Sequence, residues 1–166
     1  RLPTAQDTQD LGRALGRVLR GGDLVVLTGD LGAGKTTLTQ GLAEGLGVRG
    51  PITSPTFVIA RVHPSLVGGP DLVHVDAYRL GGIEELDDLD LDTSLDEAVT
   101  VVEWGEGVAE GLADTRLEIH LARARGGDRP VEPGETEDTE DTDPRTLRVT
   151  PVGARWIGAG LRKALL

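Results

Sequence analysis

Cysteine is missing from this chain of 166 residues, and long apolar runs are missing too. Without cysteine the protein can form neither disulfides nor thiolate metal sites, which fits a reducing compartment. The longest apolar runs, such as LVVL at 24–27, are far shorter than the roughly 20 residues that a membrane-spanning helix needs. The segment RLPTAQDTQD at 1–10 lacks the apolar core of a secretory signal. We therefore expect a cytoplasmic protein that has no membrane partner.

Positive charge is also scarce, with 17 lysines and arginines against 28 acidic residues and a formal net charge of -11. A surface that binds DNA, RNA or anionic lipid by itself needs an excess of positive charge. This balance argues against direct nucleic-acid binding, so any link to RNA is expected to be indirect. Lysine is rarer still, since Lys35 and Lys163 are the two lysines among these basic residues.

The distribution of apolar residues predicts helices and strands in alternation. Between 8 and 20, leucine and valine recur at the spacing of one helix face, and Thr4 or Thr8 is the candidate N-cap. Leucines recur every four residues after a glycine-rich stretch, so a second helix is expected there, ending at Gly47. Apolar runs predict strands at 24–28, 53–63, 71–78, 99–104, 115–124 and 147–153, and a closing helix is expected at 154–166.

The segment 126–146 differs in character from the rest of the chain. It holds three prolines, eight acidic residues and a single valine. So little apolar surface cannot offset the entropy that a chain loses on ordering. We predict a disordered acidic insertion at 126–146 within one domain that spans 1–166, since the length requires no second domain.

One glycine-rich stretch points to a specific chemistry. Gly29, Gly34, Lys35 and Thr36 fit the pattern G-x-x-x-x-G-K-[ST], between a predicted strand and a predicted helix. Glycines let backbone N–H groups wrap around a polyphosphate, and the helix that follows directs its positive end at the same anion. Lysine at this place reaches the β- and γ-phosphates, and the Thr36 hydroxyl is a Mg²⁺ ligand. The stretch therefore predicts a phosphate-binding loop, or P-loop.

A Mg²⁺ ion at a P-loop also needs a carboxylate, which usually ends a neighbouring buried strand. Asp76 and Glu103 each follow an apolar run. The alternative for each is a solvated acid at a strand end, and the P-loop makes the metal role the better interpretation. The guanine-reading pattern [NT]-K-x-D does not occur, so ATP is the expected nucleotide. His74 and His120 also lie in predicted strands, where we expect them to pack rather than to bind zinc.

Four motifs, in this order and at these separations, closely resemble the TsaE (YjeE) family of bacterial ATPases. The motifs are GDLGAGKTT at 29–37, TSPTF at 53–57, HVDAYRL at 74–80 and VVEW at 101–104. The resemblance extends from about residue 4 to residue 121, and the combination is far more specific than the P-loop alone. It implies an α/β, P-loop NTPase-like three-layer fold, with a central mixed sheet flanked by helices.

The resemblance also implies a function. Members of this family take part in the synthesis of N6-threonylcarbamoyladenosine at position 37 of tRNA. The ATPase does not transfer the threonylcarbamoyl group itself, but binds a complex of the TsaD and TsaB proteins and is thought to reset it between turnovers. The expected cofactor is Mg²⁺ with ATP as substrate, and the acidic charge agrees with contact to tRNA only through these partners.

Residue roles follow from the resemblance by position. Lys35, Asp76 and Glu103 would be catalytic. Thr36 and Glu103 would serve Mg²⁺ directly or through water, and Asp76 would be the second acid at the metal, orienting the metal's water shell or the attacking water. Thr4 would lie where the family's N-terminal segment passes the adenine of the nucleotide. The residues expected at the nucleotide are Thr4, Gly29, Asp30, Leu31, Gly32, Ala33, Gly34, Lys35, Thr36, Thr37 and Arg129.

Two further features concern the surroundings of the nucleotide. Ser54, Pro55 and Thr56 match the family's mobile segment, a switch that would register the γ-phosphate. The family usually has a short hairpin, often with an arginine near the nucleotide, where this chain has its acidic insertion. Arg129 is the nearest candidate for that arginine.

Two rival functions remain open at this point. A P-loop kinase would phosphorylate a small metabolite and would usually carry an arginine-rich lid, for which Arg123, Arg125 and Arg129 form the only cluster in the sequence. A nucleotide-dependent binding switch would hydrolyse ATP only incidentally. No arginine finger or dedicated base is evident in the sequence, so we expect hydrolysis to be slow without partners.

Overall fold

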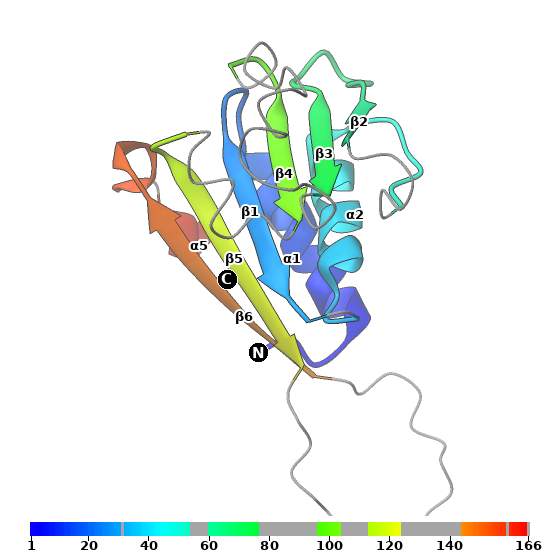
Figure 1. The fold of residues 1–166 in the computed structure, drawn as a ribbon, viewed down its shortest axis with the longest axis vertical. Coiled ribbons are helices and arrows are strands. Elements are labelled where there is room, and N and C mark those ends of the chain that lie inside the picture. The colour runs from blue at the N-terminus through cyan, green and yellow to red at the C-terminus, as the bar shows by residue number, and fades with distance from the viewer. Residues whose placement is uncertain are drawn as a thin grey trace, which may run out of the picture.

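A central sheet organises the chain (Figure 1). The computed structural model describes residues 1–30, 32–53, 60–76, 96–103, 113–123, 144–158 and 160–165. Within these ranges the sheet has six strands in the order β2-β3-β4-β1-β5-β6. Their bounds are β1 Leu24–Gly29, β2 Ala60–His63, β3 Leu72–Asp76, β4 Val99–Glu103, β5 Arg116–Arg123 and β6 Arg145–Val152.

Four parallel strands form the middle of the sheet. β3, β4, β1 and β5 run parallel to one another, whereas β2 and β6 pair antiparallel with β3 and β5 at the two edges. Every residue of β3 and β4 is buried, as the nearly continuous apolar runs of these segments predict. The carboxyl ends of the parallel strands meet at one edge, where ligands bind in folds of this type. The predicted mixed sheet with flanking helices is confirmed.

Each predicted strand is found within the described residues, with ends that differ from the expectation. Of the strand predicted at 53–63, residues 60–63 form β2, and residues 54–59 lie outside the described residues. β6 begins at Arg145 rather than at Leu147, because Arg145 and Thr146 continue the antiparallel ladder with β5. The predicted disordered insertion at 126–146 is therefore wrong at its end, since backbone pairing orders these two residues despite their lack of apolar surface. The remainder of that prediction, at 126–143, lies outside the described residues.

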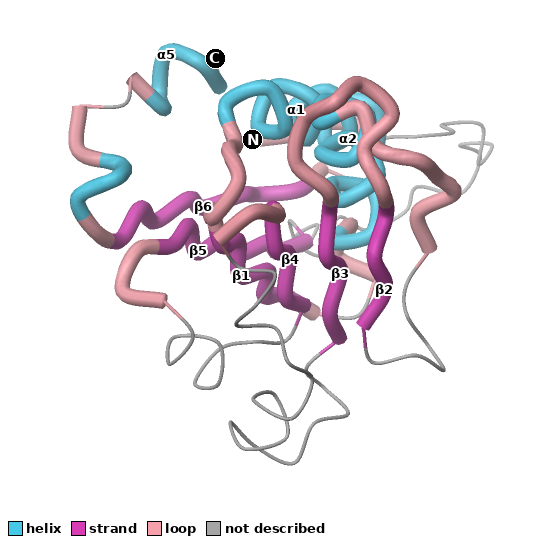
Figure 2. Tube along the Cα trace, turned by 90° about the horizontal axis from the view of Figure 1, so that it is seen from above, coloured by secondary structure: helices cyan, strands magenta, loops and turns pink. Residues whose placement is uncertain are grey.

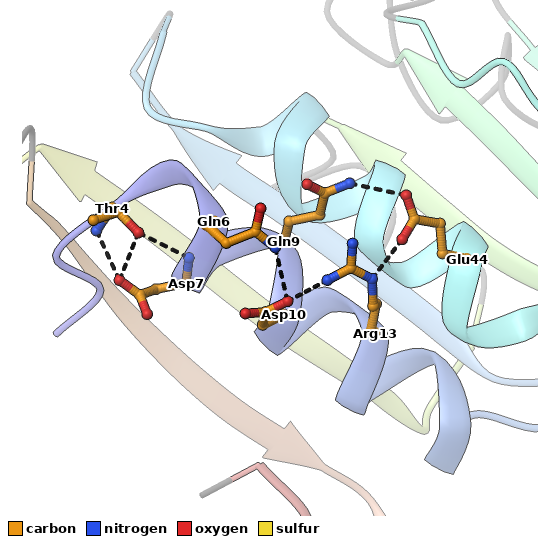
Figure 3. A network of polar contacts seen from close by, with 7 residues as sticks. All are labelled: Thr4, Gln6, Asp7, Gln9, Asp10, Arg13 and Glu44. Atoms are coloured by element: carbon orange, nitrogen blue, oxygen red, sulfur yellow. Dashed lines mark hydrogen bonds and ion pairs between the residues drawn. The ribbon is translucent and has the colours of Figure 1, made fainter. Parts of the chain in front are cut away.

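Helix α1 (Ala5–Val18) is capped at its N-terminus by Thr4, one of the two N-caps that the sequence predicts. The Thr4 hydroxyl accepts a hydrogen bond from the backbone N–H of Asp7, and the Asp7 carboxylate accepts one from the backbone N–H of Thr4. This reciprocal pair is a capping box and satisfies two N–H groups that the first turn would leave without partners. Figure 3 shows these contacts at the start of α1.

Helices α1 and α2 (Lys35–Leu46) lie together on one face of the sheet (Figure 2). Their backbones approach so closely that a Cβ on Gly12 would lie 2.3 Å from the carbonyl oxygen of Leu38, and one on Gly41 would lie 2.0 Å from that of Gln9. Glycine is the residue that permits this approach. Polar contacts of Arg13 and Gln9 with Glu44 flank the crossing (Figure 3). The helix that follows the P-loop is thus packed directly against α1.

The C-terminal segment departs from its prediction. Instead of one helix over 154–166, it forms a short 3₁₀ helix, η3 (Ala154–Trp156), and a separate helix, α5 (Leu161–Leu165). Gly158 and Gly160 between them have φ angles of 71° and 60°, a left-handed conformation that interrupts a helix. Trp156 nevertheless joins the hydrophobic core.

Within the described ranges, no helix is both long and apolar enough to cross a membrane. The described helices α1 and α2 pack on the face of the sheet that carries Val25, Leu27 and Val101, and these residues belong to one core cluster. The third layer that the sequence predicts, on the opposite face, lies outside the described residues.

Candidate nucleotide and metal site

The predicted P-loop joins the end of β1 to the start of α2 (Figure 1). Gly32 and Gly34 have φ angles of 75° and 103°, which residues with a side chain rarely adopt. A Cβ on Gly29 would lie 2.2 Å from the carbonyl oxygen of Leu121 on β5, so this glycine permits a close approach of two strands. The backbone N–H of Ala33 donates to the carbonyl of Asp30. The loop thus has the conformation for which its glycines are needed, while Leu31 lies outside the described residues.

Lys35 lies across this loop. Its ammonium donates to the carbonyl oxygens of Gly29 and Asp30 at 2.8 and 2.9 Å, and the residue is 6% exposed. Burial lowers the pKa of Lys35, while the negative charges of Glu103, Asp30 and Asp76 oppose that change. The ammonium therefore lies against the backbone of the loop and within electrostatic reach of the two carboxylates that the sequence assigns to the metal.

Asp76 and Glu103 lie at the carboxyl ends of adjacent parallel strands. They are register partners at the ends of β3 and β4, and only 8% and 2% of their surfaces are exposed. The arrowheads of β1, β3 and β4 point to the same edge of the sheet in Figure 1, where α2 begins. Both carboxylates act electrostatically on the Lys35 ammonium, so the three residues lie near one another, and the catalytic and metal roles assigned to them stay predictions.

These groups fit a Mg²⁺ ion that is shared with a nucleotide. Two buried carboxylates need a compensating cation or hydrogen bonds, and carboxylate and hydroxyl oxygens are ligands that Mg²⁺ prefers. Among the described residues, no group of three or more acidic, histidine or cysteine side chains could enclose a metal by itself. Mg²⁺ at nucleotide sites usually keeps several water ligands and binds phosphate oxygens in addition to one or two carboxylates. Asp76, Glu103 and the Thr36 hydroxyl match that smaller ligand set.

Of the remaining residues predicted at the nucleotide, some are located by the structure and others lie outside the described residues. Thr36 and Thr37 lie in the first turn of α2 and are partly exposed, as ligands of a bound phosphate or metal should be. The side chain of Thr4 is engaged with Asp7, so its place in the structure is that of a helix cap. Its predicted position beside adenine stays a prediction. The predicted switch, Ser54, Pro55 and Thr56, lies outside the described residues, as does Arg129.

Arg145 is a residue near the loop that the sequence reasoning missed. From the first position of β6, its guanidinium donates to the carbonyl oxygen of Gly32 at 3.3 Å. Its backbone N–H and C=O exchange hydrogen bonds with Leu2 at 2.7 and 2.8 Å, so the N-terminus and β6 meet beside the P-loop. Arg145 lies in the segment assigned to a disordered insertion, and a backward extension of the β6 strand pattern is the signal that would have found it.

Comparison with known proteins finds the same family that the four sequence motifs resemble. A family model described as "Threonylcarbamoyl adenosine biosynthesis protein TsaE" matches residues 2–131. The tRNA threonylcarbamoyladenosine biosynthesis protein TsaE of Streptomyces coelicolor is 59% identical over 91% of this chain and 95% of its own length. The protein of that name from Bacillus subtilis is 38% identical over 76% of this chain and 78% of its own length. The crystal structure of Bacillus subtilis YdiB is similar in fold, with a TM-score of 0.66, 33% identity and coverage of 97% of this chain and 88% of YdiB.

Proposed function

Because the chain belongs to the TsaE family of threonylcarbamoyladenosine biosynthesis proteins, we propose that it is a Mg²⁺-dependent ATPase that acts in N6-threonylcarbamoyladenosine synthesis on tRNA. The observation that carries the ATPase assignment is the convergence of Lys35 with two buried carboxylates, Asp76 and Glu103, at one edge of the sheet. A P-loop alone indicates nucleotide binding, whereas buried acids beside it supply the groups that hydrolysis needs.

Each residue has a defined task in the proposed reaction. The N–H groups of the loop between Gly29 and Thr37 hold the phosphates, and Lys35 neutralises charge that develops on the transferred phosphoryl group. Glu103 and the Thr36 hydroxyl would hold Mg²⁺, which would supply positive charge to offset that of the phosphates. Asp76 orients the water that attacks the γ-phosphorus in line with the departing ADP oxygen. We expect slow turnover by the chain alone.

The proposal extends to the partners and to the cell. Residues 1–166 act as one ATPase domain in the cytoplasm, bind a complex of the TsaD and TsaB proteins, and use the ATP cycle to reset it between turnovers. The net charge of -11 supports an indirect role at tRNA, because such a surface would repel the phosphate backbone.

The ATPase assignment is tested with ATP labelled at the γ-phosphate, incubated with the protein, Mg²⁺ and the two partner proteins. We expect the label to appear as free phosphate, and to remain in ATP when the Lys35→Ala variant replaces the wild type. Label recovered in a phosphorylated metabolite, with none in free phosphate, would instead identify a kinase. Equal capture of the partner proteins with ATP and with ADP would remove the proposed reset step.

A further inference from the structure

His74 lies on the strand next to Glu103 and contacts its carboxylate, but it has no part in the function proposed above. It lies in the middle of β3 with none of its surface exposed, and its Nε2 is 3.2 Å from Oε1 of Glu103 on β4. Asp76 follows two residues later on the same face of β3 and is the register partner of Glu103. The histidine, which the sequence assigns to packing, therefore contacts one of the two carboxylates of the site.

The surroundings of the ring fix the direction of this hydrogen bond. Nδ1 of His74 is buried and has no hydrogen-bond partner in the part of the chain that the structure describes. A proton on Nδ1 alone would leave a buried N–H unsatisfied and would place the lone pair of Nε2 against a carboxylate oxygen. The favourable arrangement has the proton on Nε2, which donates it to Oε1 of Glu103.

This bond restricts what the Glu103 carboxylate can do. A carboxylate without a partner turns about its last side-chain bond, whereas one held at Oε1 keeps a single orientation. Carboxylates that bind metals are commonly held by hydrogen bonds from neighbouring side chains, and loss of such a partner costs about 10- to 100-fold in metal affinity or activity. With Oε1 engaged by His74, Oε2 of Glu103 is the oxygen left for the metal.

We propose that His74 is a positioning residue, whose Nε2–H holds Oε1 of Glu103 and so reserves Oε2 for Mg²⁺. The proposal rests on the proposed function, because it requires Glu103 to serve Mg²⁺. It assigns to His74 a role in metal affinity that a merely packed core histidine would not have.

The test compares His74→Gln with His74→Asn, two buried amides of similar size. The amide nitrogen of glutamine reaches the place of Nε2, whereas that of asparagine reaches only the place of Nδ1. Binding of AMP-PNP, a non-hydrolysable ATP analogue, is measured by calorimetry across a Mg²⁺ titration and again in EDTA. We expect His74→Asn to lower the apparent Mg²⁺ affinity about tenfold or more, His74→Gln to stay close to wild type, and binding in EDTA to be the same in all three proteins.

Either of two results with the variants would overturn the proposal. His74→Asn with wild-type Mg²⁺ affinity would show that the hydrogen bond does not position Glu103, and an equal loss in both variants would assign the effect to the ring itself. The wild-type protein gives a check that needs no variant, since ¹⁵N NMR is expected to show His74 with its proton on Nε2, and a proton on Nδ1 alone would also overturn the proposal. Wild-type binding of AMP-PNP that is indifferent to Mg²⁺, and unchanged in Glu103→Gln, would instead overturn the proposed function, and this inference with it.

Discussion

At the scale of the residue, Lys35 is the group at which the charges of the site converge. Its buried ammonium is held by two loop carbonyls and lies in the field of Glu103, Asp30 and Asp76. A cation with fixed partners in a partly desolvated place stabilises developing negative charge more strongly than the same cation in water does. The contribution of Lys35 should therefore depend on its charge and not only on its volume.

Replacement of Lys35 by methionine keeps most of the side-chain length and removes the charge. We expect kcat for ATP hydrolysis to fall about 100-fold or more, measured as phosphate release with the partner proteins present. The matched control is Lys163→Met on the exposed surface of α5, which should hydrolyse ATP at the wild-type rate. Equal rates in the two variants would exclude a catalytic role for Lys35.

A second residue-scale prediction concerns His63, which is 5% exposed and has its Nδ1 3.1 Å from the carbonyl oxygen of Arg49. Burial lowers the pKa of His63 from its usual 6.5, the bond to Arg49 opposes this, and the charges of His74 and Arg61 lower it further. The unfolded chain then binds a proton at a higher pH than the folded protein does. The free energy of unfolding should therefore fall as the pH drops below about 6.5.

The variant His63→Gln should lose less stability on acidification than the wild type, because it has no imidazole to protonate. Urea unfolding of both proteins at about pH 8 and about pH 5.5 measures the two differences. An identical pH dependence in the two proteins would show that His63 takes up its proton equally in the folded and unfolded states.

At the scale of the element, the close crossing of α1 and α2 holds α2, the helix that follows the P-loop, in its position against α1. A Cβ on Gly41 would meet the carbonyl oxygen of Gln9 at 2.0 Å and its carbonyl carbon at 2.8 Å. These are backbone atoms of another helix, so relief requires the two helices to separate. Since α2 begins at Lys35, such a separation would also displace the end of the helix that carries Lys35.

Gly41→Ala should therefore destabilise the protein although alanine is the better helix former. The gain in helix propensity is about 1 kcal/mol, whereas overpacking typically costs about 1–3 kcal/mol and more against backbone, so we expect a net loss of about 2 kcal/mol in urea unfolding. The control is Gly69→Ala, where a Cβ would meet only ordinary contacts, with an expected change within about 0.5 kcal/mol. A Gly41→Ala protein as stable as wild type would mean that the helices separate at no cost.

The helices and strands also show which features the sequence alone could predict. Apolar runs and the P-loop pattern are local signals, so the inner strands, Lys35, Asp76 and Glu103 could be predicted. The bond from His74 to Glu103 depends on β3 lying beside β4, and the contact of Arg145 with Gly32 joins residues far apart in the chain. Such pairings need the strand order, which local spacing does not encode. The prediction of a single closing helix was wrong because Gly158 and Gly160 interrupt the helix, and the apolar repeat alone does not reveal this interruption.

At the scale of the whole molecule, the excess of negative charge is the property that bears on partners. A net charge of -11 opposes the approach of a polyanion, and binding to nucleic acid through phosphate contacts requires several lysines or arginines at the interface. The protein alone is therefore expected to give no shift of tRNA in a gel-mobility assay at about 150 mM salt. A shift that grows with protein concentration and weakens with salt would show direct contact and contradict an indirect role.

In the proposed function, ATP hydrolysis at Lys35 serves N6-threonylcarbamoyladenosine synthesis on tRNA. Mass spectrometry of tRNA nucleosides from cells depleted of the protein measures this most directly. We expect the modified nucleoside to fall on depletion, to return with the wild-type chain, and to stay low with Lys35→Ala produced at the same level. A normal amount of N6-threonylcarbamoyladenosine in the depleted cells, or full recovery with Lys35→Ala, would contradict the claim.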